Sequence, residues 1–283
     1  MRKNSLLYFL FLFLIITAKY SYGESTHICP TEEIAQLNLF GHLNLMKKTL
    51  KKCIDATNNN LNNYTVNWKI SELSYYIAEY YMFKHNINST EKFLETGVKY
   101  AKKSILINPQ GIEGKYWLIA NLAIYSDIKG PSKMIAEVIV EAKKTMEKMS
   151  SLDKQMKYMN GGWGRYIGRF YISMPSPPQS FGDSKKGVKI LENVYKKYPT
   201  LTNINVLAQG YMVRGQLFKA KRLLKANLTS SKTLNLSLYI NRRDIAFTKT
   251  LLDLTENAIK SKKGTVSISN IIKNKYNYPI NSY

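Results

Sequence analysis

The side chains best suited to hold a ligand are two arginines in the middle of the chain, Arg165 and Arg169. They stand four residues apart, so they share one face if the segment after Gly161-Gly162 is a helix. A guanidinium is planar and grips a carboxylate through two parallel hydrogen bonds. Aromatic and amide side chains complete a candidate cleft for a small organic anion, lined by Tyr116, Trp117, Asn121, Trp163, Arg165 and Arg169. The alternative is that both arginines pair with acids or backbone carbonyls at a helix junction.

The arginines lie in a stretch that must join two sets of helices. Gly161-Gly162 ends one helix, and the segment up to Ser173 is expected to form the next. Closely spaced prolines then impose an extended backbone, because proline restricts its own φ and the residue before it. Asp183 is the expected N-cap of the following helix. Of a later pair, Arg242-Arg243, we expect one side chain between the last helices and the other in solvent.

Residue patterns typical of enzymes are nearly absent. The three histidines, His27, His42 and His85, fall on separate expected elements. The sequence contains no zinc-protease, paired-cysteine, nucleophile-elbow or phosphate-loop pattern. The segment Gly161 to Gly164 is followed by no Lys-Ser/Thr pair and preceded by no strand pattern. We therefore expect no catalysis, no cofactor and no metal.

The two cysteines, Cys29 and Cys53, set a geometric alternative. An even number of cysteines in an exported chain permits a disulfide. One straight helix over residues 31–52 would separate its ends by about 30 Å, whereas a disulfide needs Cα atoms within about 7 Å. The bond and the unbroken helix therefore exclude each other. A break at Gly41 would permit the bond, and both outcomes stay open.

Residues 1–23 have the pattern of a secretory signal peptide. Arg2 and Lys3 precede a short apolar run, which ends before the small residues Ser21 and Gly23. We expect cleavage before Glu24 and a periplasmic or secreted protein. The alternative is an uncleaved membrane anchor.

The formal charge of +23 allows two interpretations. One is a binder of nucleic acid or of an anionic membrane. The other is a lysine-rich composition with solvated lysine faces, which the scarcity of arginine favours, because nucleic-acid sites cluster arginine with aromatic residues. Export also argues against nucleic acid. We expect no nucleic-acid partner, and a cationic binder of membranes or envelope polymers remains an alternative function.

Hydrophobic periodicity predicts helices and no strands. The expected helices cover about residues 31–56, 65–84, 89–106, 112–128, 132–150, 162–173, 183–197, 202–214, 217–227 and 236–260. Helix-stop positions at Pro109, Asp153 and Pro199 recur about every 45 residues, with two helices in each interval, as in helix-pair arrays. The predicted fold is all-α, with stacked antiparallel helix pairs in a tetratricopeptide-like α-solenoid over residues 24–262. Residues 263–283 are predicted to be a weakly ordered tail.

Several motifs occur in the order and spacing of a known family. They are Gly114-Lys115-Tyr116-Trp117 with Ala120-Asn121, then Leu152-Asp153, Gly161-Gly162, Arg165, Gly168, Tyr171, Pro175 and Gly182-Asp183, and finally Asn241-Arg242-Arg243 before Ala246. Through these motifs the chain resembles the TatT family over roughly residues 90–255. Members of that family are periplasmic tetratricopeptide-like subunits associated with TRAP transporters.

The resemblance implies a helical subunit with a cleft or pore that receives a small organic ligand or docks a substrate-binding protein. It implies no reaction. The expected partners are therefore a substrate-binding or transporter subunit and a small organic anion, and a homo-oligomer stays open. The alternative is a stand-alone periplasmic or secreted scaffold for protein interactions, because a shared fold does not determine a function.

Overall fold

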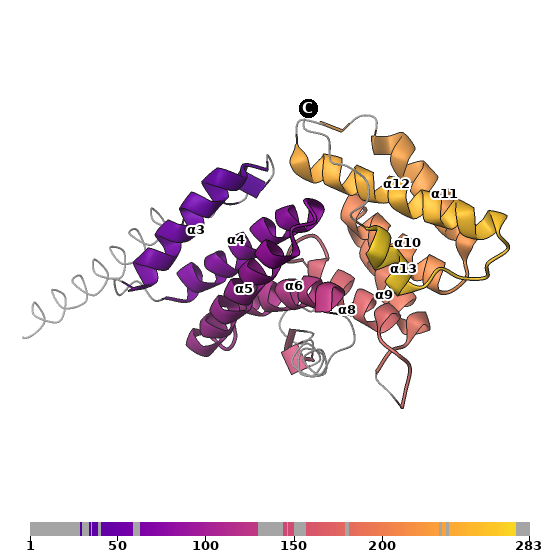
Figure 1. Cartoon of the computed structure of the whole chain (residues 1–283). Helices are drawn as coiled ribbons and strands as arrows, with labels where there is room; N and C mark the ends of the chain where they lie inside the picture. The colour runs from indigo at the N-terminus through magenta and orange to yellow at the C-terminus, as the bar shows by residue number, and fades with distance from the viewer. Residues whose placement is uncertain are drawn as a thin grey trace, which may run out of the picture.

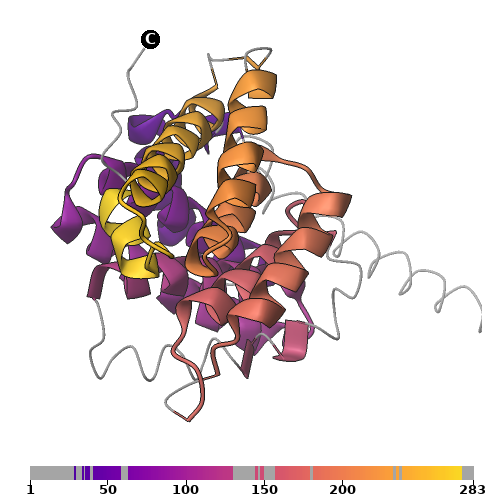
Figure 2. The same ribbon diagram turned by 90° about the vertical axis from the view of Figure 1, so that its right-hand side faces the viewer.

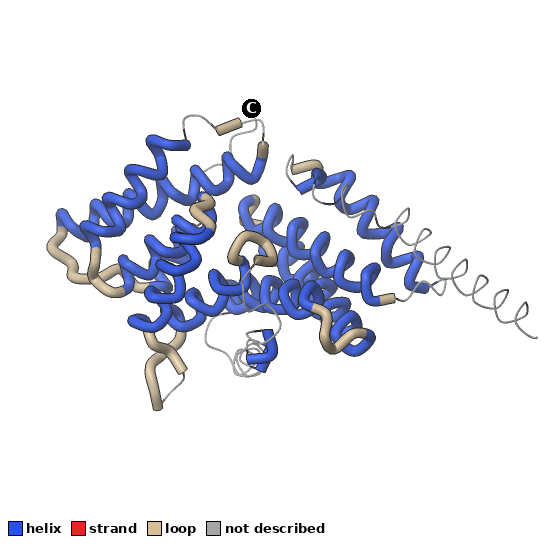
Figure 3. The backbone as a smooth tube through the Cα atoms, turned by 180° about the vertical axis from the view of Figure 1, so that it is seen from behind, coloured by secondary structure: helices blue, strands red, loops and turns tan. Residues whose placement is uncertain are grey.

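The computed structural model describes residues 29, 34, 36–38, 41–58, 63–129, 144–145, 147–149, 157–178, 181–231, 234–235 and 238–275. Throughout these residues the secondary structure is helical and contains no strand (Figure 3). The fold is therefore all-α, with helices packed in adjacent pairs as in an α-solenoid, as the periodicity predicted. The expected signal peptide lies outside the described residues, as does most of the helix expected at 132–150.

The helices are labelled in Figure 1. In chain order they are α3 (Leu43–Asn58), α4 (Tyr64–Phe83), α5 (Ile87–Ile107), α6 (Ile112–Lys129), α8 (Gly162–Ser173), α9 (Ser184–Lys197), α10 (Leu201–Val213), α11 (Leu217–Ser230), α12 (Tyr239–Lys260) and α13 (Ile268–Asn274). Most helices pack against the next one in the chain: α4 against α5, α8 against α9, and α10 against α11. None of the helices in the described parts is both long and apolar enough to cross a bilayer.

The helices form two groups joined through α8. Helices α3 to α6 make the N-terminal group, and α9 to α13 make the C-terminal group, in which α9, α10, α11 and α12 lie next to one another (Figures 1 and 2). Helix α8 packs on α6 on one side and on α9 and α10 on the other. This arrangement brings residues from early and late parts of the chain to face each other above α8.

Side-chain caps determine where several helices begin. Asp183 accepts a hydrogen bond from the Lys186 amide at 2.9 Å and starts α9, as predicted. The predicted start of α5 at Ser89 or Thr90 was wrong. Asn86 caps that helix instead, accepting from the Ser89 amide at 3.0 Å, so α5 begins at Ile87. Asparagine is as good an N-cap as serine or threonine, and Asn86 precedes both Ser89 and Thr90 in the chain.

A break at Gly41 and a disulfide occur together near the N-terminus. Gly41 has a φ of +71°, in the left-handed region that glycine adopts freely, and α3 begins two residues later. Cys29 and Cys53 are joined in a disulfide with their Cα atoms 5.6 Å apart. Both sulfurs are fully buried against the core of the N-terminal group. Of the two outcomes that the sequence left open, the structure therefore shows the disulfide, and the turn at Gly41 interrupts the helix that would have prevented it.

The prediction of a weakly ordered tail was wrong for residues 263–275. The Val266 amide donates to the Met212 carbonyl at 3.1 Å, and α13 packs on α10 and α12. Val266 and Ile271 are 4% and 1% exposed. The segment is short and polar, so its sequence lacks the periodicity of a core helix, yet these two apolar residues are enough to dock it on the C-terminal group.

Candidate functional site

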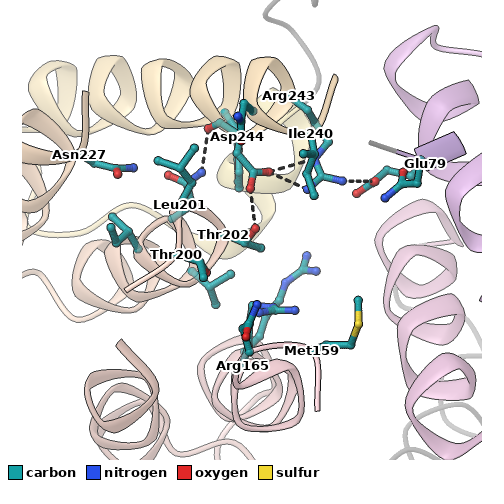
Figure 4. Close-up of a pocket in the computed structure, with 18 of the residues that line it drawn as sticks. Glu79, Met159, Arg165, Thr200, Leu201, Thr202, Asn227, Ile240, Arg243 and Asp244 are labelled. Atoms are coloured by element: carbon teal, nitrogen blue, oxygen red, sulfur yellow. Dashed lines mark hydrogen bonds and ion pairs between the residues drawn. The ribbon is translucent and has the colours of Figure 1, made fainter. Parts of the chain in front are cut away.

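A cavity of about 560 Å³ lies between the two helix groups. Its walls come from α4, α6 and α8 on one side and from α10, α11 and α12 on the other (Figure 4). This volume falls within the range of small-molecule sites, roughly 300–1,000 Å³. The cavity is therefore the candidate functional site.

Glycines place α8 close enough to its neighbours to form the floor of the cavity. Gly161, with a φ of +81°, turns the chain into α8, and a Cβ on Gly162 would come within 2.7 Å of the Tyr116 ring. Further along, a Cβ on Gly168 would lie 2.5 Å from Leu191 Cγ, and one on Gly187 would lie 2.8 Å from the Gly168 carbonyl oxygen. Helix α8 therefore packs closely on the Tyr116 side chain of α6 and on the backbone of α9, and these contacts fix the direction of its arginines.

Arg165 faces the cavity and has two hydrogen-bond partners, both of them neutral. Its Nη1 donates to Asn203 Oδ1 at 2.6 Å, and its Nη2 donates to the Tyr116 hydroxyl at 3.2 Å. The Tyr166 ring lies 5.9 Å from the guanidinium carbon. Burial raises the pKa of Tyr116 and of Tyr166, so neither hydroxyl ionises to balance the positive charge. No acid of the described residues forms an ion pair with Arg165.

Arg169 is in a different situation. Its Nη2 lies 2.7 Å from Asp127 Oδ2, and both side chains are largely buried. The pair joins α8 to α6 and neutralises Arg169. Arg169 therefore fits the alternative of pairing with a nearby acid, whereas Arg165 forms no ion pair with a described residue, and its role in ligand binding stays a prediction.

A cluster of Glu79, Arg243 and Asp244 spans the cavity. Arg243 Nη1 lies 2.5 Å from Glu79 Oε2 on α4, and Nη2 lies 2.8 Å from Asp244 Oδ1 on α12. Asp244 Oδ2 also accepts a hydrogen bond from the Thr202 hydroxyl on α10 (Figure 4). Burial opposes the charge of Arg243, but its two acids hold the pKa of the guanidinium well above its ordinary value. The cluster is thus a permanent ion network linking the two helix groups.

An aromatic wall, formed by side chains of α4, α6 and α8, lines the N-terminal side of the cavity. Tyr76 and Tyr116 pack edge-on against Trp117, with ring centroids 5.3 and 5.0 Å apart, and Tyr116 packs against Tyr166 at 5.5 Å. Edge-to-face contacts of this kind hold rings in a defined orientation. The wall therefore offers a rigid apolar surface beside Arg165.

A chain of amides forms the polar wall in the C-terminal group. Asn227 Nδ2 donates to Thr248 Oγ1 at 3.2 Å, and Thr248 Oγ1 donates to Asn205 Oδ1 at 2.7 Å. Asn205 Nδ2 in turn donates to the Asp244 carbonyl at 2.9 Å, and Gln209 Nε2 donates to the Asn205 carbonyl at 3.2 Å. These bonds orient the amides of α10 and α11 and prevent the polar wall from rearranging freely.

Four of the six predicted residues line the cavity: Tyr116, Trp117, Arg165 and Arg169. Asn121 and Trp163 do not. Asn121 is fully buried between α4 and α6, where its Nδ2 donates to the Trp117 carbonyl at 2.7 Å and to Ser71 Oγ at 3.1 Å. Trp163 is 1% exposed in the hydrophobic core. Both residues support the wall from behind, because α6 and α8 turn the faces that carry them inward.

Other residues of the cavity were missed in the sequence, namely Glu79, Thr202, Asn205, Gln209, Asn227, Asp244 and Lys275. The sequence pattern could have identified two of them, Asn205 and Gln209. They stand four residues apart in α10, which is otherwise mostly apolar, so they share one face of a buried helix. Buried amides require hydrogen-bond partners, which points to a polar site. Lys275 gave no signal, because it follows a segment that looked like a tail. Arg243 is buried, as expected of one member of its pair. The expectation that the other member lies in solvent was wrong, because Arg242 is half-buried and its Nε atom is inaccessible to solvent.

The fold and the site define a class: an all-α helical-repeat protein with a ligand-sized cavity between its two helix groups. No family model matches the chain, and the comparison with curated proteins also gives no match. Within the described residues, no group of three or more His, Cys, Asp or Glu side chains is arranged to hold a metal ion.

Proposed function

We propose that this protein is an exported, non-enzymatic binding protein that holds a small organic anion in the cavity. Arg165 carries the proposal. Arg169 and Arg243 also line the cavity, and each has a carboxylate partner, whereas Arg165 has only an amide oxygen and a tyrosine hydroxyl.

Physical chemistry favours an anionic ligand at this position. A cation removed from water is costly unless an opposite charge and hydrogen bonds compensate it. A ligand carboxylate would supply both, through charge-assisted bonds that are about twice as strong as neutral ones. The aromatic wall beside Arg165 suits an apolar body attached to that carboxylate. The acids of the cavity support binding over catalysis, since Glu79 and Asp244 are both held by Arg243.

We further propose that the protein is an accessory subunit of a transporter. The resemblance to the TatT family supports it, because Gly161-Gly162, Arg165 and Gly168 form the start of α8 that positions the arginine. In this role the protein would hold its ligand for a substrate-binding partner. Genes for transporter membrane and substrate-binding subunits beside this one would support the role, and a stand-alone gene would favour an independent scaffold.

Calorimetric titration of the purified protein tests the binding function. The probes are benzoate, 3-phenylpropanoate and hexanoate, each compared with its uncharged amide. We expect an acid to bind and its amide to bind at least about tenfold more weakly, because the charged hydrogen bonds are lost. Arg165→Gln should weaken binding of the acid by a similar factor. Arg214→Gln, an exposed arginine at the end of α10, is the matched control and should change nothing.

Two results would contradict the proposal. One is the absence of saturable binding for all three acids. The other is equal affinity for acids and amides in both the wild-type protein and the Arg165→Gln variant, with circular dichroism showing an intact fold.

A further inference from the structure

Two turns of the C-terminal group meet at the end that points away from the N-terminal group. Helix α12 leads outward from the cavity, so the turn after it lies at the outer end of the C-terminal group (Figure 1). The turn between α10 and α11 packs against it, because a Cβ on Gly215 would come within 2.7 Å of the Gly264 carbonyl oxygen. The Val266 amide donates to the Met212 carbonyl at 3.1 Å, and Leu217 shares a hydrophobic cluster with both residues. The two turns therefore form one packed surface.

This surface, formed by residues 214–219 and 260–265, is named the basic tip. It contains five cationic side chains and no acidic one. All five are exposed, namely Arg214, Lys219, Lys260, Lys262 and Lys263. None of them forms an ion pair with another described residue. The same surface carries Phe218, which is 76% exposed. The basic tip therefore combines unbalanced positive charge with an exposed aromatic ring.

The lysines of α11 beyond the basic tip are in a different situation. Lys221 and Lys225 lie 3.0 and 3.3 Å from the Glu256 carboxylate on α12. That acid balances part of their charge, whereas no acid of the described residues pairs with the cations of the tip. The unbalanced charge is therefore concentrated at the end of the C-terminal group and does not continue evenly along α11.

We propose that the basic tip docks the protein on the surface of an anionic lipid bilayer. The inference does not depend on the cavity or on its ligand. Lysine and arginine side chains near anionic lipids each raise the affinity by about fivefold. The Phe218 ring enters the boundary between headgroups and acyl chains, where burial of apolar area adds to the electrostatic attraction. A specific protein interface is depleted of charge at its centre, so five cations with a single exposed ring fit a lipid surface better.

Helix α12 separates the basic tip from the cavity. Its stretch from Arg243, at the cavity, to Lys260, at the tip, is about 25 Å long by the rise of an α-helix. A protein docked through the tip therefore keeps its cavity away from the lipid headgroups. Substitutions in the tip should leave the affinity for 3-phenylpropanoate unchanged.

Cosedimentation of the purified protein with lipid vesicles tests the charge of the basic tip. We expect binding to phosphatidylcholine vesicles that contain about one quarter phosphatidylglycerol, and little binding to phosphatidylcholine alone. Binding should be lost at about 1 M NaCl, where the Debye length falls to about 3 Å. The double variant Lys262→Gln/Lys263→Gln should bind about 25-fold more weakly. The control Lys48→Gln/Lys51→Gln removes the same charge from exposed positions on α3 and should keep the wild-type affinity.

Substitutions of Phe218 test the aromatic contribution. Phe218→Ala should weaken vesicle binding at least about fivefold. Leu106→Ala, at an 80% exposed position on α5, is the matched control and should change nothing. Phe218→Trp gives a direct readout, because lipids brominated near the headgroup should quench its fluorescence. The wild-type tryptophans, Trp68, Trp117 and Trp163, are buried and should not be quenched.

Three results would overturn the inference, provided that circular dichroism shows each variant to be folded. The first is the failure of the wild-type protein to bind the mixed vesicles. The second is an equal loss in the tip variant and in the α3 control, which would assign binding to net charge alone. The third is tip-dependent binding of poly-glutamate without binding to vesicles, which would make the partner an acidic protein. The proposed function stands or falls separately, because its readout is the affinity for 3-phenylpropanoate.

Discussion

Arg243 on α12 lies 2.5 Å from Glu79 on α4, so one ion pair joins residues from the two helix groups above the cavity. Both side chains are about nine-tenths buried. Arg243 has a second acid, Asp244, whereas Glu79 forms no second ion pair among the described residues. The three side chains therefore do not contribute equally to stability.

Removal of Arg243 should cost much more than removal of the Glu79 charge. Arg243→Gln leaves two buried carboxylates without a cation and should lower the free energy of unfolding by about 3–5 kcal/mol. Glu79→Gln leaves Arg243 with Asp244 and should cost only about 1–3 kcal/mol. Urea unfolding followed by circular dichroism measures both.

Lys221→Gln provides the control, because its pairing with Glu256 lies at the surface, where solvent screens the charges and the pair contributes little to stability. Equal losses for Arg243→Gln and Lys221→Gln would show that the cluster does not hold the two helix groups together.

Gly168 should tolerate no side chain. An added Cβ would lie 2.5 Å from Leu191 Cγ, so Gly168→Ala forces α8 and α9 apart and should destabilise the fold by about 1–3 kcal/mol. Because α8 carries Arg165, affinity for 3-phenylpropanoate should fall as well. Gly264→Ala meets nothing within 4 Å and is the matched control for both readouts. Unchanged stability and affinity in Gly168→Ala would refute the view that this close contact aims the arginine.

Glu72 is expected to make stability depend on pH. Burial raises the pKa of this carboxyl to about 7, against the opposing effects of the Tyr76 hydroxyl at 3.1 Å and of Lys69. Between the ordinary glutamate pKa and about pH 7 the folded state binds more protons than the unfolded state, so this group lowers stability as the pH rises through that window. Glu72→Gln should remove the effect and be more stable than wild type above pH 7, by about 1–3 kcal/mol. Parallel pH profiles for the two proteins would contradict this.

Anion affinity should depend on the protonation of Lys275. Burial lowers its pKa to about 8, below the ordinary lysine value, and a bound anion would raise it, so binding is accompanied by proton uptake. Affinity for 3-phenylpropanoate should be constant below about pH 7.5 and fall above pH 8, by up to about tenfold per pH unit. Titrations of wild type and Lys275→Gln across this range provide the measurement. The variant should show a flat profile, and an identical decline in both proteins would assign the effect to another group.

The sequence was most informative where structure is local. Apolar periodicity predicted the helices, and Asp183 and Gly41 behaved as their chemistry requires, one as a cap and the other as a break. Arg165 and Arg169 were found because they lie on one helix beside a glycine pair. Their different roles could not be predicted, since they depend on Asp127 and Asn203, which reach α8 from other helices.

The remaining cavity residues depend on tertiary packing. Glu79 and Arg243 are separated by more than half of the chain, and the sequence around neither residue predicts that the two form a pair. Asn121 and Trp163 had the right chemistry, but the inward faces of α6 and α8 carry them. Lys275 shows the same limit, because two buried apolar residues were enough to dock a segment that has no helical periodicity of its own.

The partnership of Glu79 with Arg243 also bears on biosynthesis. A ribosome releases the chain from its N-terminus, so α4, α6 and α8 emerge and can begin to pack well before α12 exists. During that interval the Glu79 carboxylate has to remain hydrated, and the surfaces that later enclose the cavity stay open. A nascent chain or a proteolytic fragment that ends before α12 would keep Arg165 and the aromatic wall, yet it would lack the part of the opposite wall that α12 supplies. Ligand recognition is thus among the last properties this polypeptide acquires.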